Sequence, residues 1–267
     1  RLGLSYHNIK GLHKIVDSGI LSRADWTSKT IAFPDAPDDK HLIHYRDILS
    51  AICSLLGNPA HAKHIVYKPK KIFSNAQKEN RIYNKMWTGK RWHAIQVIRL
   101  PKGAALSPVV IATDKTQLTQ FSDSKSAYPV YLTLGNIPRA IQRRPSQHAC
   151  ILIGYLSVSK IIGIEKSSRV QRLFHESMKI ILDPLTKAGR DGIEVVGGDG
   201  AVRRVYSVLA CYVADYPEQC LVMCSKYGTY PKYKQPPEEL SASTAGEPRT
   251  DQWTESVINK AKEDTQL

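Results

Sequence analysis

Apolar residues recur at helical spacing in two stretches of the chain. Between residues 44 and 56 they fall on one face, and Gly57 is placed to end that helix in a left-handed conformation. A longer apolar stripe over residues 168–187 predicts a second helix, which Pro184 should kink or end early and Gly189 should stop. We expect most apolar side chains of both stripes in a core.

A third helix is expected between residues 74 and 89, with a more polar composition than the first two. Ser74 can cap its first turn while Gln77 reaches back, and Gly89 lies where it would end. This helix would carry a cationic face. A weak helix is also expected over residues 251–262.

Runs rich in Val, Ile and Tyr that are bounded by turn residues predict strands. They cover residues 93–100, 108–113, 128–134, 150–156, 193–196 and 205–214. The sequence Gly197-Gly198-Asp199-Gly200 joins the last two runs and predicts a tight turn. Residues 34–39 are rich in proline and aspartate and predict a turn-rich connector.

Length and composition indicate one large globular unit or two modest ones. The 267 residues, 42% of them hydrophobic, can bury a substantial core without disulfides. The five cysteines form an odd set within mainly apolar runs, which favours reduced, buried thiols in a reducing compartment. No apolar run approaches the roughly 20 residues of a membrane span and no signal-peptide pattern opens the chain, so we expect a soluble protein. Because the first residue is Arg1, we expect a piece of a longer product.

The formal charge of +14 is concentrated in residues 63–102, where eleven Lys or Arg residues face one acid, Glu79, giving +10. Such a field attracts polyanions. Tyr67, Tyr83, Trp87 and Trp92 are interleaved with the cations and could stack on unpaired bases; the alternative is a solvated helix whose aromatics pack in the core. The candidate DNA contacts are Lys68, Lys70, Lys71, Lys78, Arg81, Lys85, Lys90, Arg91, Arg143 and Arg144.

Two of the expected strands end in a carboxylate, Asp114 in one case and Asp215 in the other. Carboxylates from separate strands can bind a pair of Mg²⁺ or Mn²⁺ ions about 3.5 to 4 Å apart, which activate water and stabilise the leaving oxygen of a phosphodiester. Asp199 is a third candidate, although a Gly-Asp-Gly sequence is more often a hairpin turn, and Glu218 could support the site or begin a helix. An aspartate that closes a strand is also often a turn residue or a helix cap. Phosphate-binding glycine loops and nucleophile elbows are missing from the sequence, which gives no support to nucleotide binding of that type or to serine hydrolysis.

Co-linear motifs through nearly the whole chain resemble the Plavaka-type transposases of fungal mobile elements, part of the Kyakuja-Dileera-Zisupton group. The motifs are YRD at 45–47, SLLGNP at 54–59, WTG at 87–89, WH at 92–93, DKTQL at 114–118, SAYPVYLT at 126–133, GNIP at 135–138, PSQHA at 145–149, GDG at 198–200, RRV at 203–205 and ADYPEQC at 214–220. The resemblance implies an α/β fold, an RNase H-like mixed sheet with flanking helices, preceded by a basic helical region. The predicted order of strands, a helix and a strand that ends in an acid agrees with it.

The resemblance also implies an Asp, Asp, Glu metal site that cuts and rejoins DNA in the nucleus. Asp114 takes the place of the first metal-binding aspartate, and Asp215 lies in the most characteristic motif. The glutamate expected from a later helix has no convincing equivalent; only position suggests Glu255 and Glu263. If the triad is incomplete, we expect DNA binding to be kept and strand transfer to be lost. The resemblance is also compatible with a homo-oligomer.

On this basis the chain divides into a partial N-terminal connector (1–40), a basic helical DNA-contacting region (41–92), an RNase H-like core that we expect to be truncated (93–225) and a C-terminal segment (226–267). Where relatives have a Cys-Pro-Lys-Cys knuckle after the DYPEQC motif, this chain has Tyr230-Pro231-Lys232-Tyr233. A structural zinc site needs four Cys or His donors, so we expect no zinc and a buried structural role for Cys220 and Cys224.

The sequence is compatible with three functions. The first is a transposase-derived enzyme that cuts phosphodiesters through Asp114 and Asp215. The second is a non-catalytic DNA-binding relic or domesticated protein that uses the basic residues. The third is an interaction or structural fold without a nucleic-acid role.

Overall fold

The computed structural model describes residues 25–118, 126–159, 166–226, 228–239, 241, 244 and 246–265. The chain forms two compact units. The first consists of Arg1–Lys160 with Glu176–Val213, and the second of Ile161–His175 with Ala214–Leu267. Within the described ranges, no helix is both long and apolar enough to span a bilayer.

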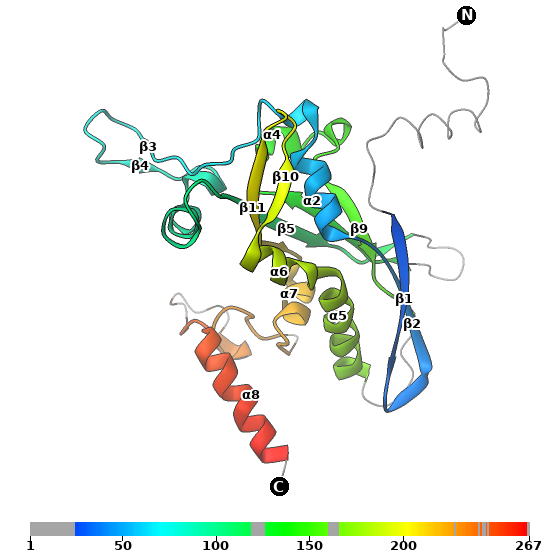
Figure 1. Cartoon of the computed structure of the whole chain (residues 1–267). Coiled ribbons are helices and arrows are strands. Elements are labelled where there is room, and N and C mark those ends of the chain that lie inside the picture. Colours follow the sequence, from blue (N-terminus) through cyan, green and yellow to red (C-terminus); the bar gives the residue numbers. More distant parts are fainter. Residues whose placement is uncertain are drawn as a thin grey trace, which may run out of the picture. The chain divides into compact units, whose positions relative to one another are not determined.

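A mixed, mostly antiparallel seven-stranded sheet forms the centre of the first unit (Figure 1). Its spatial order is β1 (Trp26–Phe33), β2 (Ala36–Arg46), β9 (Ile151–Tyr155), β8 (Pro129–Leu134), β5 (Ala105–Thr113), β11 (Val202–Val213) and β10 (Ile193–Val196). The neighbours β5 and β11 are parallel, and each of the other five neighbouring pairs is antiparallel. The fold class is therefore α/β, with strands where the Val, Ile and Tyr runs predicted them for β5, β8, β9, β10 and β11.

The interior strand β5, which lies between β8 and β11, is buried along nearly its whole length. A continuous apolar run of this kind is typical of a strand covered on both faces. Helices α2 (Ile48–Leu56) and α6 (Pro184–Asp191) pack against the sheet and against each other. Burial of Ile52, Leu55 and Leu56 on α2 contributes about 1.5–3 kcal/mol for each side chain.

Two helix boundaries follow from local chemistry. Helix α2 begins at Ile48 rather than near residue 44, because the Asp47 carboxylate caps it by accepting the Ser50 N–H at 2.8 Å. Pro184 separates α5 (Lys166–Leu182) from α6, as predicted, but α6 ends at Asp191 and the left-handed Gly192, not at Gly189. The boundary between the two units falls within α5.

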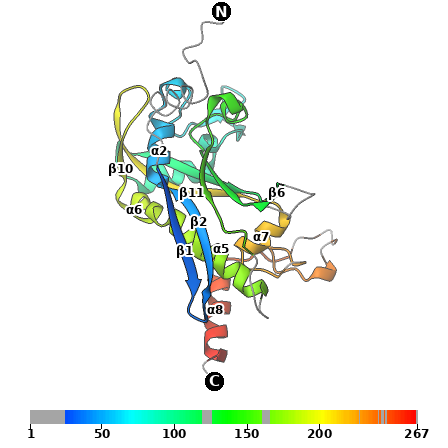
Figure 2. The same ribbon diagram turned by 90° about the vertical axis from the view of Figure 1, so that its right-hand side faces the viewer.

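The expected connector at residues 34–39 is instead part of a long hairpin at one edge of the sheet (Figures 1 and 2). Only Pro34 and Asp35 form its turn, and β2 already begins at Ala36. Further along β2, the exposed residues Lys40, Leu42 and His44 alternate with His41 and Ile43, which are buried. A hairpin with one buried face needs only that alternation.

The helix expected over residues 74–89 is wrong. The strands β3 (Ile72–Phe73) and β4 (Arg81–Ile82) form a separate two-stranded ribbon there, followed by the single turn η2 (Met86–Thr88). Apart from Ala76, residues 74–80 hold no apolar side chain that could bury a helical face. Asn75 instead accepts the Glu79 N–H through its side chain, a local bond that competes with helix formation.

The strand expected over residues 93–100 is also wrong, since this stretch is α3 (Lys90–His93) followed by the π-helical turn η3 (Ala94–Arg99). Trp92 is buried and donates its indole N–H to Gln96. The Gln96 amide in turn donates to the carbonyl oxygens of Tyr67 and Ala104. These bonds fix the segment as a helix, although its β-branched residues favour a strand.

The second unit contains α7 (Tyr216–Val222), the turn η5 (Pro237–Glu239) and α8 (Asp251–Thr265), the last as predicted. In the first unit, η1 (Pro59–His61), α4 (Arg139–Gln142) and η4 (Pro145–Gln147) are short turns. A small ribbon of β6 (Thr116–Gln117) and β7 (Ser126–Ala127) follows β5 in the chain.

Candidate functional site

Asp114 follows the last residue of β5 and is exposed to solvent. The preceding residue, Thr113, is buried, and its hydroxyl shares a 2.8 Å hydrogen bond with the Tyr212 hydroxyl of β11. The neighbouring strands β5 and β11 are thus tied together by side chains directly before the acid. Asp114 is held at the carboxyl end of a rigid strand, a position from which it can bind a cation.

The parallel pairing brings the carboxyl ends of β5 and β11 to one edge of the sheet. Ala112 is the partner of Val213 in the last register position of this pair. Asp114 comes two residues after Ala112 in sequence, and Asp215 comes two residues after Val213. Both acids thus follow the last paired residues of their strands by the same number of residues in the sequence. Asp215 itself belongs to the second unit.

Asp215 caps helix α7. Its Oδ1 atom accepts the Glu218 N–H at 3.0 Å, and its backbone is extended, as at a typical N-cap. The structure therefore gives this residue the helix-cap role that the sequence left open. Only one carboxylate oxygen is used in the cap, so capping leaves the other oxygen able to bind a cation.

Asp199 lies in the turn between β10 and β11. Its carboxylate forms a two-pronged ion pair with Arg203, at 2.6 and 2.7 Å, and also accepts the Ala201 N–H. The Arg203 hydrogen bonds and the Ala201 N–H hold the pKa of Asp199 at about 2, below its ordinary value of 3.8. Asp199 therefore has the hairpin-turn role that its sequence favoured.

The turn of Asp199 and the end of β5 lie at opposite ends of the sheet. Asp199 precedes the first residue of β11, and that strand runs parallel to β5 from Val205 to Val213. Twelve residues at about 3.3 Å each span about 36 Å from first to last. Metal ions about 4 Å apart cannot connect Asp199 with Asp114.

We expect the ion pair of Asp199 to stabilise the fold in a pH-dependent way. Because the folded-state pKa of about 2 is below the ordinary 3.8, the contribution is complete above pH 4 and is lost as the pH falls through 2. Urea unfolding should show Asp199→Asn to be less stable than wild type at pH 7, with the gap closing between pH 4 and 2. Asp191→Asn, which alters an exposed acid outside the ion pairs of the described residues, is the control. A gap that is unchanged at pH 2 would contradict the assignment.

The remaining acids do not complete a metal site within the described part of the chain. Glu218 is buried in the first turn of α7, whereas Glu255 and Glu263 are exposed on α8. No group of three His, Cys, Asp or Glu residues is gathered around one point in the described ranges. Asp114 is the one candidate acid that the sheet itself positions.

The basic segment, defined as residues 63–102, presents most of its cations to solvent. Lys68, Lys70, Lys71, Lys78 and Lys85 are exposed, and the ion pairs of the described residues include none of them. Lys90, Arg91, Arg143 and Arg144 are exposed as well, and Arg81 is half-buried. The positive charge of these exposed residues is therefore not neutralised by the ion pairs of the described residues.

The positive charges of the basic segment affect the pKa of His93. Burial lowers the pKa of its ring, and the charges of Lys71 and Arg81 lower it further. The imidazole is therefore neutral at pH 7. This histidine adds no charge to the basic segment.

The aromatic residues of the basic segment are mostly not a stacking surface. Trp92 is only 3% exposed, and Tyr67 lies beneath the Arg203 guanidinium, 4.1 Å from its ring centre. Trp87 is half-buried. Tyr83 is the exception, because it is 53% exposed with Arg81 over its ring. Rings that are packed into the core in this way are not exposed for stacking on bases.

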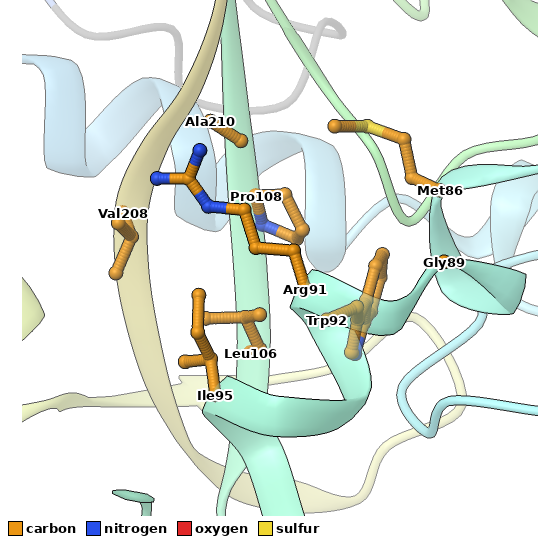
Figure 3. Close-up of a pocket in the computed structure, with 9 residues that line it drawn as sticks. All are labelled: Met86, Gly89, Arg91, Trp92, Ile95, Leu106, Pro108, Val208 and Ala210. Atoms are coloured by element: carbon orange, nitrogen blue, oxygen red, sulfur yellow. The ribbon is translucent and has the colours of Figure 1, made fainter. Parts of the chain in front are cut away.

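An apolar pocket of about 100 Å³ shows how this segment is fixed to the sheet (Figure 3). Leu106 and Pro108 of β5 and Val208 of β11 face Trp92 and Ile95 across it. The side chain of Arg91 extends over the same space. Apart from Arg91 and Gly89, the lining consists of apolar and aromatic side chains, so the pocket marks a packing contact between the segment and the sheet.

The comparison with protein families decides what kind of chain this is. The pattern of the Plavaka transposase family matches residues 6–267. The chain belongs to this family. A search of curated proteins gave no match.

Several Plavaka motifs have structural roles in this chain. In the GNIP motif, Asn136 is fully buried and its amide donates to the carbonyl oxygens of Val66 and Leu106. In the GDG motif, a Cβ on Gly198 would lie 2.4 Å from the carbonyl oxygen of Asn58, in the SLLGNP motif. A contact that short is impossible for any residue but glycine. The two motifs are needed together because their backbones touch, which sequence spacing cannot reveal.

Where the resemblance led us to look for a cysteine knuckle, two tyrosine rings pack against each other. The rings of Tyr230 and Tyr233 lie 5.3 Å apart. All five cysteines are free, but the expectation that they are buried holds only for Cys220. Cys224 is exposed beyond the end of α7, in a left-handed conformation, and its sulfur lies 3.1 Å from Nε2 of His175.

Proposed function

We propose that this chain is a transposase-derived domain that binds duplex DNA through the basic segment and cleaves phosphodiesters with Mg²⁺ or Mn²⁺ held by Asp114 and Asp215. Membership of the Plavaka family supports the transposase ancestry and DNA as the partner. The observation that carries the catalytic part is the parallel pairing of β5 with β11, because it brings to one edge the ends of the two strands that Asp114 and Asp215 follow in the sequence.

An RNase H-like core is part of this proposal. Strands β5, β8 and β9 precede the helices α5 and α6, and the chain then returns through β10 to β11. Strand β11 lies beside β5 in the parallel direction. Strands, then helices, then a strand that ends in an acid is the order expected for such a core, and the return beside the first strand supports it.

The donor chemistry fits hard divalent cations. Asp114 and Asp215 offer carboxylate oxygens, the ligands that Mg²⁺ and Mn²⁺ prefer, and neither acid has an ion-pair partner among the described residues. Such ions, when bound, supply Lewis acidity and a water of lowered pKa. The contribution of the chain is to hold Asp114 on a strand that the Thr113–Tyr212 bond ties to its neighbour. The exposed lysines contribute attraction for the DNA backbone.

The direct test is cleavage of supercoiled plasmid by the purified chain. With Mg²⁺ or Mn²⁺ we expect nicked product, and with EDTA in place of the metal we expect none. Binding to a labelled duplex is measured in parallel at about 50 mM salt, where non-specific contacts to phosphates are strong.

The two assays distinguish an active nuclease from a DNA-binding protein without catalytic activity. Salt-sensitive binding without metal-dependent nicking would overturn the enzymatic part and leave a non-catalytic DNA-binding relic. That second function is favoured by one observation: among the described residues, no three His, Cys, Asp or Glu side chains gather around one point. A chain that fails to bind DNA at all would overturn both.

A further inference from the structure

The strands β3 and β4 with their connecting loop form an arm, defined as residues 70–85. Its strands pair with each other and with no strand of the seven-stranded sheet. Figure 1 shows the arm as a narrow cyan ribbon that extends away from that sheet. Two-stranded ribbons are marginally stable alone in water, so a free arm of this kind needs another reason to be ordered.

Local hydrogen bonds make the loop of the arm a defined structure. The Ser74 N–H donates to the Asn80 carbonyl oxygen at 2.9 Å, which closes the loop. Asn75 holds Glu79 at both ends, by accepting its N–H and donating to its carboxylate. Lys78 lies between them in a left-handed conformation, with φ of 60°. The loop is thus shaped before any partner arrives, which lowers the entropy cost of binding.

The base of the arm is anchored just as specifically. The Lys70 N–H donates to the carbonyl oxygen of Trp87 at 2.9 Å. The Thr88 hydroxyl accepts the N–H groups of Asn84 and Lys85, and Arg81 donates to the Thr88 carbonyl oxygen. Thr88 is fully buried. The arm therefore projects from a fixed point of the fold.

Side chains on the arm are of the two kinds that duplex DNA recognition uses. Lys70, Lys71, Lys78 and Lys85 are exposed cations that can contact phosphates, and the one acid, Glu79, is held by Asn75. Gln77 and Asn80, in the loop, are exposed amides whose side chains have no hydrogen-bond partner elsewhere in the described structure. An amide can bond both N6 and N7 of adenine in the major groove.

We infer that the arm enters the major groove of duplex DNA, with its lysines on the flanking phosphates and with Gln77 and Asn80 on base edges. The inference rests on the DNA binding of the proposed function and adds its geometry and its sequence-reading residues. Paired strands lie about 4.8 Å apart, and a major groove about 12 Å wide admits such a ribbon with its side chains. A minor groove about 6 Å wide admits a ribbon only when the duplex is deformed, at a cost in free energy that the major groove does not require.

The groove is tested by competition in EDTA, so that cleavage plays no part. Methyl green, which occupies the major groove, should displace the wild-type protein from a labelled duplex, and netropsin, which occupies the minor groove, should not. The opposite order would overturn the inference. Duplex binding that neither compound affects would overturn it as well, while leaving DNA binding and metal-dependent nicking intact.

The phosphate contacts are tested by Lys71→Gln with Lys78→Gln. Each lost phosphate contact lowers the slope of log K against log salt by about 0.9, so the double variant should lose about 1.8 on every duplex. The control is Lys29→Gln with Lys40→Gln, which removes the same charge from two exposed lysines of the β1–β2 hairpin. Equal slopes for the arm variant and the control would overturn the inference.

The base contacts are tested on a duplex selected by wild type from a random library. Gln77→Ala with Asn80→Ala should lower the affinity for the selected duplex at least about 10-fold and leave the affinity for unrelated duplexes and the salt slope unchanged. Far-ultraviolet circular dichroism checks that the variant is folded. An equal loss on all duplexes, no loss, or a library that yields no preferred sequence would overturn the role of the two amides.

Discussion

Asp114→Asn should abolish metal-dependent cleavage of DNA while leaving DNA binding unchanged. The substitution keeps the shape of the side chain and removes the charge that a divalent cation requires. Loss of a metal that supplies several kcal/mol of transition-state stabilisation, about 4 for example, slows the reaction about a thousandfold. The measurement is the rate of plasmid nicking in Mg²⁺ and in Mn²⁺, with duplex binding as the second readout. Because Asp114 is exposed at a strand end, the variant should unfold at the wild-type temperature.

The matched control is Asp199→Asn, which removes the same charge at the opposite end of the sheet. It should nick plasmid at the wild-type rate, because Asp199 is held by Arg203 in a turn. Asp215→Asn should abolish nicking as well, and its amide oxygen can still accept the Glu218 N–H, so the cap of α7 is kept. If Asp114→Asn nicks as fast as wild type, the metal assignment is wrong.

The second large effect concerns salt. We expect the affinity of the wild-type chain for duplex DNA to fall about a thousandfold or more between 50 and 200 mM salt, provided that six or more phosphates are contacted. The described structure offers enough exposed cations for this, among them Lys68, Lys70, Lys85 and Lys90. Replacing these four by Gln should lower the slope of log K against log salt by about 3.6. Fluorescence anisotropy with a labelled duplex measures it.

Four exposed lysines outside the basic segment provide the control. Lys29, Lys40, Lys187 and Lys260 are exposed, and replacing them by Gln changes the net charge by the same amount. If binding depends on where the cations lie, this variant should keep the wild-type slope. Equal losses in the two variants would mean that net charge alone attracts DNA and that the basic segment has no special role.

The sequence predicted best where one face of an element is covered by a core. The stripes of α2 and α5, the break at Pro184 and the Val- and Ile-rich strands from β5 to β11 lie close to where periodicity placed them. The sequence-based prediction failed over residues 74–100, where buried positions do not recur with the period of a helix or of a strand. There the outcome is set by hydrogen bonds to distant partners, such as the bond from Gln96 to Tyr67, and by the local bonds of Asn75.

The candidate acids show the same division. Sequence identified Asp114, Asp199 and Asp215, and for the last two it also offered the turn and the cap that the structure contains. What it could not supply was the separation of Asp199 from Asp114. That separation depends on the direction and register of β11 beside β5, and no local pattern encodes which strand will be the neighbour of another.

By itself, then, the sequence determined the family, the concentration of charge in residues 63–102 and the strands that form the middle of the sheet. Each of these depends on residue identity or on short-range periodicity. Tertiary structure alone decided that the basic segment projects a two-stranded arm, that Trp92 is core, and that the ends of β5 and β11 share one edge. The reason is physical: those features arise from contacts between residues far apart in the chain, whose free energy is gained only when the sheet is assembled.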